Sequence, residues 1–139
     1  MTNRELGRGY IKDACVILTE AEASLEQGHF HRTIRKCQES VEMALKGLLR
    51  MAGIEYPKAH RVGRVLVESA VAQVVPAECL RDIARIADEL ADAREEAFYG
   101  SESSSAAELF TRDDATDALS KAKTVETFVA ELVHRYIRP

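Results

Sequence analysis

HRTIRKCQESVEMALKGLLRMAG, residues 31–53, carries the clearest helical pattern of the chain. Its apolar residues recur at steps of three and four, which brings them to one face of an α-helix. Gly53 follows the last of them, and glycine commonly ends a helix because it tolerates the left-handed backbone conformation. The stretch therefore predicts an amphipathic helix with a buried face made of Ile34, Cys37, Val41, Ala44, Leu48 and Ala52.

The segments on either side of this helix are also apolar at helical spacing. Residues 4–27 predict a helix that Gly28 ends, and its buried face consists of Ile11, Cys15, Leu18, Ala21 and Leu25. On the other side, RVGRVLVESAVAQVV (residues 61–75) runs up to Pro76. We expect a third helix there, although the many valines also fit a strand.

Two further helices are predicted in the second half of the chain. Pro76 suits the first turn of a helix that runs to Tyr99, and Gly100 ends it. The polar stretch SESSSAAEL (residues 101–109) then indicates a surface loop. Thr111 and Asp114 have the spacing of a capping box, which predicts the start of a last helix reaching Ile137.

These elements predict an all-α fold, an antiparallel up-and-down bundle. With 139 residues and 46% hydrophobic content, we expect one domain over residues 1–139. If successive helices alternate in direction, the end of the helix at 76–99 lies beside the loop at 58–64. The basic stretch HFHRTIRK, residues 29–36, then lies at the opposite end of the bundle.

Composition excludes some classes of protein. The net charge of −4 gives no general attraction to nucleic acid, although it leaves room for a local basic patch. The first residues, MTNRELGRGY, lack the apolar core of a signal peptide, and no stretch approaches the length of a membrane span. We therefore expect a cytoplasmic protein, with Cys15, Cys37 and Cys79 as buried reduced thiols.

Arg94 is the first candidate functional residue. It follows Leu80 and Ala87 at intervals of seven, which puts its charge on the apolar stripe of its helix. A charge there needs a partner or an aqueous cleft. Two interpretations remain open: a structural ion pair with Glu42, and a functional site that binds an anion.

The aromatic residues after Arg94 differ in orientation. Phe98 lies one turn away and can pack on the arginine. Tyr99 is turned by about 140° from Arg94 on a regular helix. Arg94 and Tyr99 can therefore share a site only if the helix ends between them, or across a dimer interface.

The loop KAHRVGR, residues 58–64, supplies further candidates. Lys58 and Arg61 are cations that can bind a phosphate, and His60 can serve as a general acid or base. A histidine that only orients the following helix is the alternative for His60. Neither metal nor cofactor is expected, since the two Glu-x-x-His spacings, at 26–29 and 131–134, lack further inward-facing carboxylates.

The order of these features resembles the HEPN family (higher eukaryotes and prokaryotes nucleotide-binding). The resemblance rests on LEQGHFHRTIRKCQESVEMALKGLL at 25–49, with Gln38, Glu42 and Lys46, on AREEAFYG at 93–100, and on FTRDDATDALSKA at 110–122. The histidine-bearing loop at His60 adds to it. It implies a bundle of four main helices plus one shorter helix, often assembled as a homodimer.

The resemblance also implies a range of functions. Several family members are metal-independent ribonucleases, especially toxins of toxin–antitoxin pairs, which use an arginine and a histidine separated by four to six residues. Others accompany a minimal nucleotidyltransferase. Arg94 matches the arginine, but the histidine window here holds Tyr99, Gly100 and Ser101. A phenol, with an ordinary pKa of about 10, is a poor proton shuttle at neutral pH.

We therefore expect a non-catalytic or degenerate member of this family. It would act as a dimeric module associated with nucleotides or RNA, or as the partner of a nucleotidyltransferase, and its binding residues would be Arg94, Tyr99, Lys58 and Arg61. The alternative is an endoribonuclease, a toxin with an antitoxin partner, with Arg94 in a composite dimer site and His60 as the proton shuttle.

Overall fold

The computed structural model describes residues 2–56 and 61–136. The first two helices, α1 (Asn3–Glu26) and α2 (Phe30–Met51), form an antiparallel hairpin. Gly28 closes α1 with a φ of 79°, and Gly53 follows α2 with a φ of 74°. Both glycines adopt the left-handed conformation expected of helix-ending residues, so these two helix ends are where the sequence predicts them.

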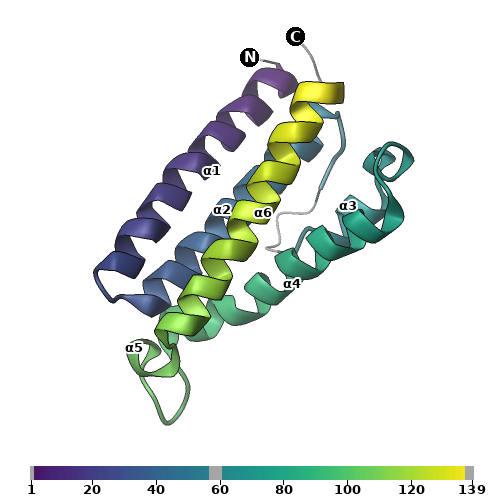
Figure 1. The fold of residues 1–139 in the computed structure, drawn as a ribbon. Coiled ribbons are helices and arrows are strands. Elements are labelled where there is room, and N and C mark those ends of the chain that lie inside the picture. The colour runs from purple at the N-terminus through teal and green to yellow at the C-terminus, as the bar shows by residue number, and fades with distance from the viewer. Residues whose placement is uncertain (1, 57–60, 137–139) are drawn as a thin grey trace.

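The last long helix, α6 (Arg112–Tyr136), lies alongside this hairpin and packs against both α1 and α2 (Figure 1). The predicted capping box starts it. The backbone N–H of Asp114 donates to the Thr111 hydroxyl at 3.2 Å, and the N–H of Thr111 donates to the Asp114 carboxylate at 2.9 Å. The two bonds satisfy backbone donors that have no partner within the helix.

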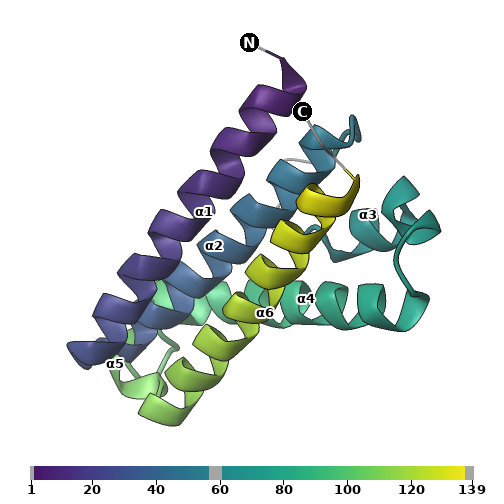
Figure 2. The same cartoon turned by 45° about the horizontal axis from the view of Figure 1, so that its top comes forward.

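The fourth long helix, α4 (Ala77–Tyr99), crosses these helices at a steep angle (Figure 2). Short elements lead into it and out of it: α3 (Gly63–Glu68) and the 3₁₀ turn η1 (Ala70–Gln73) precede it, and α5 (Ala106–Leu109) follows it. Over the described ranges every element is helical, which confirms the all-α bundle and resolves the valine-rich segment as helix.

The core lies where α1, α2, α4 and α6 meet, and it combines large aliphatic side chains from α2 with small ones from its neighbours. Leu45, Leu48 and Leu49 are at most 1% exposed, and Ala14, Ala21 and Ala122 are fully buried. The small residues let helix backbones approach closely. Gly7 and Gly47 are the extreme case, since a Cβ built on Gly47 would lie 2.7 Å from the carbonyl oxygen of Gly7.

One prediction about the bundle holds only in part. Arg61, in the loop expected beside the end of α4, does pair with Asp92 of that helix, but the basic stretch 29–36 does not lie at the opposite end of the bundle. The end of α4 lies beside the beginning of α2, because Arg94 bonds to Gln38 and the guanidinium of Arg35 lies over Phe98. The segment 61–75 breaks at Ser69, whose hydroxyl accepts the N–H of Val71, and six-residue α3 is too short to cross the bundle. Without a third full-length helix, α4 crosses α2 and ends beside the basic stretch 29–36.

The cysteine prediction holds only in part. All three cysteines are free, but Cys37 alone is buried, whereas Cys15 and Cys79 are exposed. Burial raises the pKa of the Cys37 thiol to about 12. Burial and the neighbouring Glu126 carboxylate also raise the pKa of Cys15.

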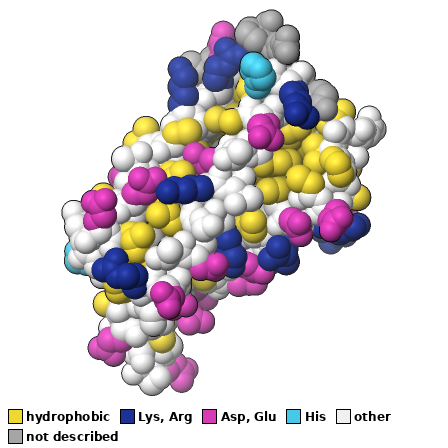
Figure 3. Space-filling model, viewed as in Figure 1, with side chains coloured by type: hydrophobic (Ala, Val, Ile, Leu, Met, Phe, Trp, Pro, Cys, Tyr) yellow, Lys and Arg dark blue, Asp and Glu magenta, His cyan; other side chains and the backbone are white. Residues whose placement is uncertain are grey.

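The crossing of α4 leaves apolar side chains at the surface. Figure 3 shows them gathered between α6 and the arm formed by α3 and α4. A hollow of about 130 Å³ lies there, and its apolar lining is Val74, Val75, Pro76, Cys79, Phe128 and Leu132. No described helix is both long and apolar enough to cross a membrane.

Candidate functional site

A chain of polar side chains links Arg94 on α4 to one face of α2. The Nη1 of Arg94 donates to Gln38 Oε1, and Gln38 Nε2 donates to Glu42 Oε1 at 2.8 Å. Lys46 Nζ then donates to the other oxygen of Glu42 at 2.9 Å. The three α2 residues are spaced by four and therefore lie on one helix face. The predicted pair of Arg94 and Glu42 is thus joined through Gln38.

The guanidinium of Arg94 is held by a neutral amide, so its charge is not neutralised by this contact. Gln38 is 2% exposed, which fixes the amide in place. Glu42, which accepts from the same Gln38 amide, already forms an ion pair with Lys46 at 2.9 Å. Among the described residues, no carboxylate forms an ion pair with Arg94. The head group is therefore available to an anion.

A second arginine lies near the first. The guanidinium carbon of Arg35 is 3.6 Å from the ring centroid of Phe98, and that of Arg94 is 4.8 Å from the same centroid. Packing of Phe98 on Arg94 was predicted, and it is confirmed. Burial, together with the positive charges of Arg32 and Arg94, lowers the pKa of Arg35, although Glu39 opposes this shift. Two guanidinium groups from different helices therefore lie beside one aromatic ring.

Arg94 forms one end of a groove of about 560 Å³ along α2. The side chains of Ile17 and Met43 give it an apolar floor. The other end holds Arg50, whose guanidinium carbon lies 5.3 Å from the ring of Tyr10 and 5.9 Å from that of Tyr56. Among the described residues, its lining consists of Tyr10, Ile17, Glu39, Glu42, Met43, Lys46, Arg50, Tyr56 and Arg94.

The other predicted site residues do not join this groove. Tyr99 is 81% exposed and is absent from the lining. Arg61 forms ion pairs with Asp88, at 3.8 Å, and with Asp92, and it does not line the groove either. Lys58 and His60 lie outside the described residues, so the structure does not place them.

Histidines do occur at the basic start of α2, although none lines the groove. Burial and the positive charges of Arg32, Arg35 and His29 lower the pKa of His31. The surroundings of His31 thus disfavour its protonated form. The groove itself offers hydrogen-bond donors, acceptors and aromatic faces, which suit binding better than proton transfer.

Sequence reasoning missed several residues of this groove, among them Tyr10, Met43, Arg50 and Tyr56. A signal for Arg50 existed, because Gln38, Glu42, Lys46 and Arg50 are spaced by four beside the apolar stripe of α2. The two tyrosines carried no such signal. They come together only because the start of α1 lies against the end of α2.

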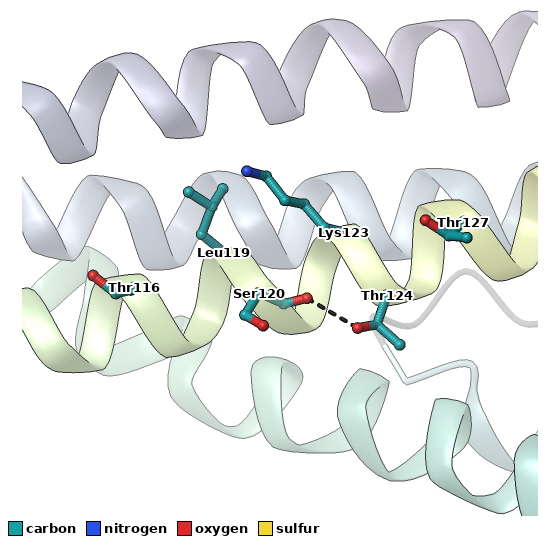
Figure 4. Close-up of a pocket in the computed structure, with 6 residues that line it drawn as sticks. All are labelled: Thr116, Leu119, Ser120, Lys123, Thr124 and Thr127. Carbon is teal, nitrogen blue, oxygen red and sulfur yellow. Dashed lines mark hydrogen bonds between the residues drawn. The ribbon is translucent and has the colours of Figure 1, made fainter.

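A second hollow, of about 550 Å³, lies on α6 and is lined by Thr116, Leu119, Ser120, Lys123, Thr124 and Thr127 (Figure 4). All six residues come from one helix. The Thr124 hydroxyl donates to the backbone carbonyl of Ser120 at 3.1 Å, and Lys123 pairs with Glu22 at 3.7 Å. These two polar groups are therefore already bonded. In the part of the chain that is described, no cluster of His, Cys, Asp and Glu could hold a metal ion.

Comparison with known proteins supports the fold and assigns the family. The HEPN domain model matches residues 8–132, nearly the whole chain. The chain belongs to the HEPN family. This HEPN protein is similar in structure to TT1696 from Thermus thermophilus, with a TM-score of 0.77 and 25% identity over 90% of this chain and 96% of that one.

A second solved structure, ST0689, described as an archaeal HEPN homologue, has a TM-score of 0.73 and 22% identity. The alignment covers 91% of this chain and 97% of that one. At this identity the likeness concerns the fold alone. No curated protein matches the chain.

Proposed function

We propose that this HEPN protein is a non-catalytic module that binds the phosphate of a nucleotide or of RNA at Arg94. The observation that carries the proposal is the contact of Arg94 with Gln38, which orients the guanidinium without neutralising it. Arg35, on the same aromatic ring, adds a second positive charge. A phosphate placed there would gain charge-assisted hydrogen bonds. These ligands are cytoplasmic, and we propose the same location for the protein.

The residues at the positions of the family's catalytic histidine support the non-catalytic assignment. The positions at which ribonucleases of the family carry histidine hold Tyr99, Gly100 and Ser101. Tyr99 is exposed and lies outside the groove. Cleavage of RNA by its own 2′-hydroxyl needs a base for that hydroxyl and an acid for the leaving oxygen. Among its described residues, the groove offers a cation for the phosphate but no group suited to shuttle protons.

Thermal-shift titration with AMP, GMP, CMP and UMP tests the proposal. We expect the melting temperature of the wild type to rise with nucleotide concentration, since a ligand that binds only the folded state stabilises it. Arg94→Ala should abolish the rise. Arg81→Ala is the matched control, because Arg81 is an exposed arginine on the same helix, outside the groove. A wild type that responds to none of the nucleotides removes the ligand part of the proposal.

The second part of the proposal is assembly. We propose that the protein works as a homodimer or with a protein partner, in particular a minimal nucleotidyltransferase encoded beside it. Light scattering coupled to gel filtration measures whether the protein is a homodimer. Co-purification of the co-expressed protein and nucleotidyltransferase measures whether the two bind each other. A monomer that retains no such partner would contradict this part.

An endoribonuclease is the alternative that the same arginine supports. In that case Arg94 would stabilise the charge of the pentacoordinate phosphorus, with one copy from each subunit of a dimer, and His60 would move the proton. The purified protein should then cleave single-stranded RNA in the presence of EDTA. Arg94→Ala and His60→Ala should each abolish the cleavage. Cleavage that survives both substitutions excludes these residues from the mechanism.

A further inference from the structure

The end of the groove opposite Arg94 has the composition of a base-stacking site. Tyr10 comes from α1 and Tyr56 from the segment after α2, and both rings are partly buried and line the groove. Arg50 lies over both of them, at 5.3 and 5.9 Å. Planar aromatic and guanidinium groups are the surfaces on which unpaired bases stack. This end therefore suits a nucleobase better than a bare phosphate.

The charge of Arg50 is also available to a ligand. Its contacts are with the two aromatic rings, and no carboxylate among the described residues pairs with it. Lys46, one turn earlier on α2, is bonded to Glu42 but still lines the groove and lies 5.5 Å from the Tyr56 ring. A base stacked on a tyrosine would have a cation beside it for its own phosphate.

The two ends are too far apart for one nucleotide. Arg94 contacts α2 at Gln38, and Arg50 lies twelve residues further along the same helix. At 1.5 Å per residue this separation is about 18 Å along the axis. A mononucleotide is shorter than that, so it would occupy one end only. A short oligonucleotide can place a phosphate at Arg94 and a base at Tyr10 and Tyr56.

The middle of the groove favours RNA over DNA. Glu39 and Glu42 line it, and carboxylates repel phosphates but accept hydrogen bonds from hydroxyl groups. Glu42 is already bonded to Gln38 and Lys46, whereas Glu39 has a looser ion pair with Lys36 at 3.8 Å. Glu39 is thus the acceptor for a 2′-hydroxyl, the group by which proteins distinguish RNA from DNA.

We infer that the groove along α2 is a subsite for single-stranded RNA, in which a base stacks on Tyr10 or Tyr56 beside Arg50 while a phosphate further along the strand is bound by Arg94. The inference rests on the proposed phosphate site at Arg94 and extends it. It assigns four further residues to binding, Tyr10, Glu39, Arg50 and Tyr56, and it specifies a ligand longer than one nucleotide.

Fluorescence anisotropy with a labelled hexamer of adenosine RNA tests the inference. We expect Arg50→Gln and the double variant Tyr10→Leu, Tyr56→Leu each to weaken binding by about tenfold or more, as measured for single aromatic stacking platforms. The double variant Tyr10→Phe, Tyr56→Phe is the matched control, because it keeps both rings and should bind as the wild type does. Circular dichroism melts verify that each variant is folded.

Two further ligands separate this inference from the phosphate site. If AMP occupies the Arg94 end of the groove, Arg94→Ala should weaken its binding. The double variant Tyr10→Leu, Tyr56→Leu should then bind AMP as the wild type does. The matching DNA hexamer should bind more weakly than the RNA, and Glu39→Gln should narrow that difference.

The outcomes are distinguishable. If AMP binds through Arg94 but the hexamer is unaffected by the leucine variants, the stacking subsite is refuted and the proposed function stands. If neither AMP nor the hexamer binds, both are refuted. If an acidic peptide of glutamates competes with RNA and depends on the two tyrosine rings, the groove is a peptide site and the inference is overturned.

Discussion

Arg35 and Arg94 lie on different helices and share one aromatic ring, that of Phe98. Their guanidinium carbons are 3.6 and 4.8 Å from its centroid. The two positive charges, one on α2 and one on α4, therefore lie close together. The group that both contact is an aromatic ring and not a carboxylate. Burial, followed by the charges of Arg32 and Arg94, lowers the pKa of Arg35, so the contact with the ring offsets these effects only in part. The arrangement keeps both cations available to an anion.

Replacing Phe98 should therefore weaken both the fold and the site. Phe98→Leu keeps apolar volume but removes the ring that both arginines contact. We expect a loss of about 1–3 kcal/mol in the free energy of unfolding, from two cation–π contacts and imperfect packing. Urea denaturation measures it. Tyr99→Leu, at the exposed neighbouring position, should change stability by less than about 0.5 kcal/mol. Equal losses at the two positions would contradict the shared-ring arrangement.

Gln38→Glu should abolish anion binding without unfolding the protein. The new carboxylate would lie where the amide oxygen accepts from Arg94, so it would neutralise the guanidinium directly. It would also face the like charge of Glu42, which explains why an amide serves here. We expect the thermal shift with nucleotides to disappear while the far-ultraviolet circular dichroism stays helical. An unchanged nucleotide response would show that the anion does not bind at Arg94.

The sequence predicted helix positions well and the relation between helices poorly. Helix ends were found because Gly28, Gly53 and Gly100 act locally, through their own backbone conformation. The direction of α4 was wrong because it depended on whether residues 61–75 cross the bundle. The helix breaks at Ser69, so these residues do not cross the bundle. The valine-rich pattern around Ser69 did not reveal the break.

The candidate site shows the same difference between features set within one helix and features set by packing between helices. Arg94 and its contact with Phe98 follow from spacing within one helix, so both could be predicted. Gln38 was noted as part of the family pattern, but its role as the link between Arg94 and Glu42 depends on how α4 crosses α2. Tyr10 and Tyr56 converge from segments far apart in the sequence. Contacts of this kind arise from packing, and one sequence carries no local signal for them.

Thiol reactivity should separate the three cysteines. Cys79 and Cys15 are exposed, while Cys37 is buried with a pKa raised to about 12. Because the thiolate is the reactive form, Cys37 should not react with an aromatic disulfide reagent in the native protein. We expect two thiols to react in buffer and three in denaturant. Cys79→Ser should leave one slow native thiol, since the pKa of Cys15 is also raised. Three fast thiols in the native protein would contradict the buried position of Cys37.

The titration of His31 should report anion binding. Its native pKa lies below the ordinary 6.5 because of burial and the charges of Arg32, Arg35 and His29. Between the native value and 6.5 the unfolded chain binds more protons, so His31 lowers stability as the pH falls through 6.5, and the effect is absent at higher pH. His31→Asn should flatten this part of the stability profile.

Nuclear magnetic resonance of the histidine rings measures the same group directly. Phosphate bound near Arg35 would offset the positive charges and raise the pKa of His31. A His31 titration that is equal with phosphate and with chloride at the same ionic strength would place the anion elsewhere.

The contact of Gly7 with Gly47 should make α1–α2 packing intolerant of a single methyl group. A Cβ on residue 47 would lie 2.7 Å from the Gly7 carbonyl oxygen and 2.8 Å from Cγ1 of Ile11. The oxygen belongs to the backbone, so relief requires the helices to separate. Gly47→Ala should therefore lower the free energy of unfolding by roughly 1–3 kcal/mol, despite the better helix propensity of alanine.

Gly9→Ala is the matched control on the same hairpin. Gly9 is exposed within α1, and a Cβ built on it meets nothing within 4 Å. Because only the helix propensity changes, the free energy of unfolding of this variant should rise by about 0.5–1 kcal/mol. Urea denaturation of the two variants in parallel gives opposite signs if the backbones approach as described. A stabilising effect at both positions would mean that α1 and α2 are further apart, and that the groove lined by Tyr10 and Arg50 has a different shape.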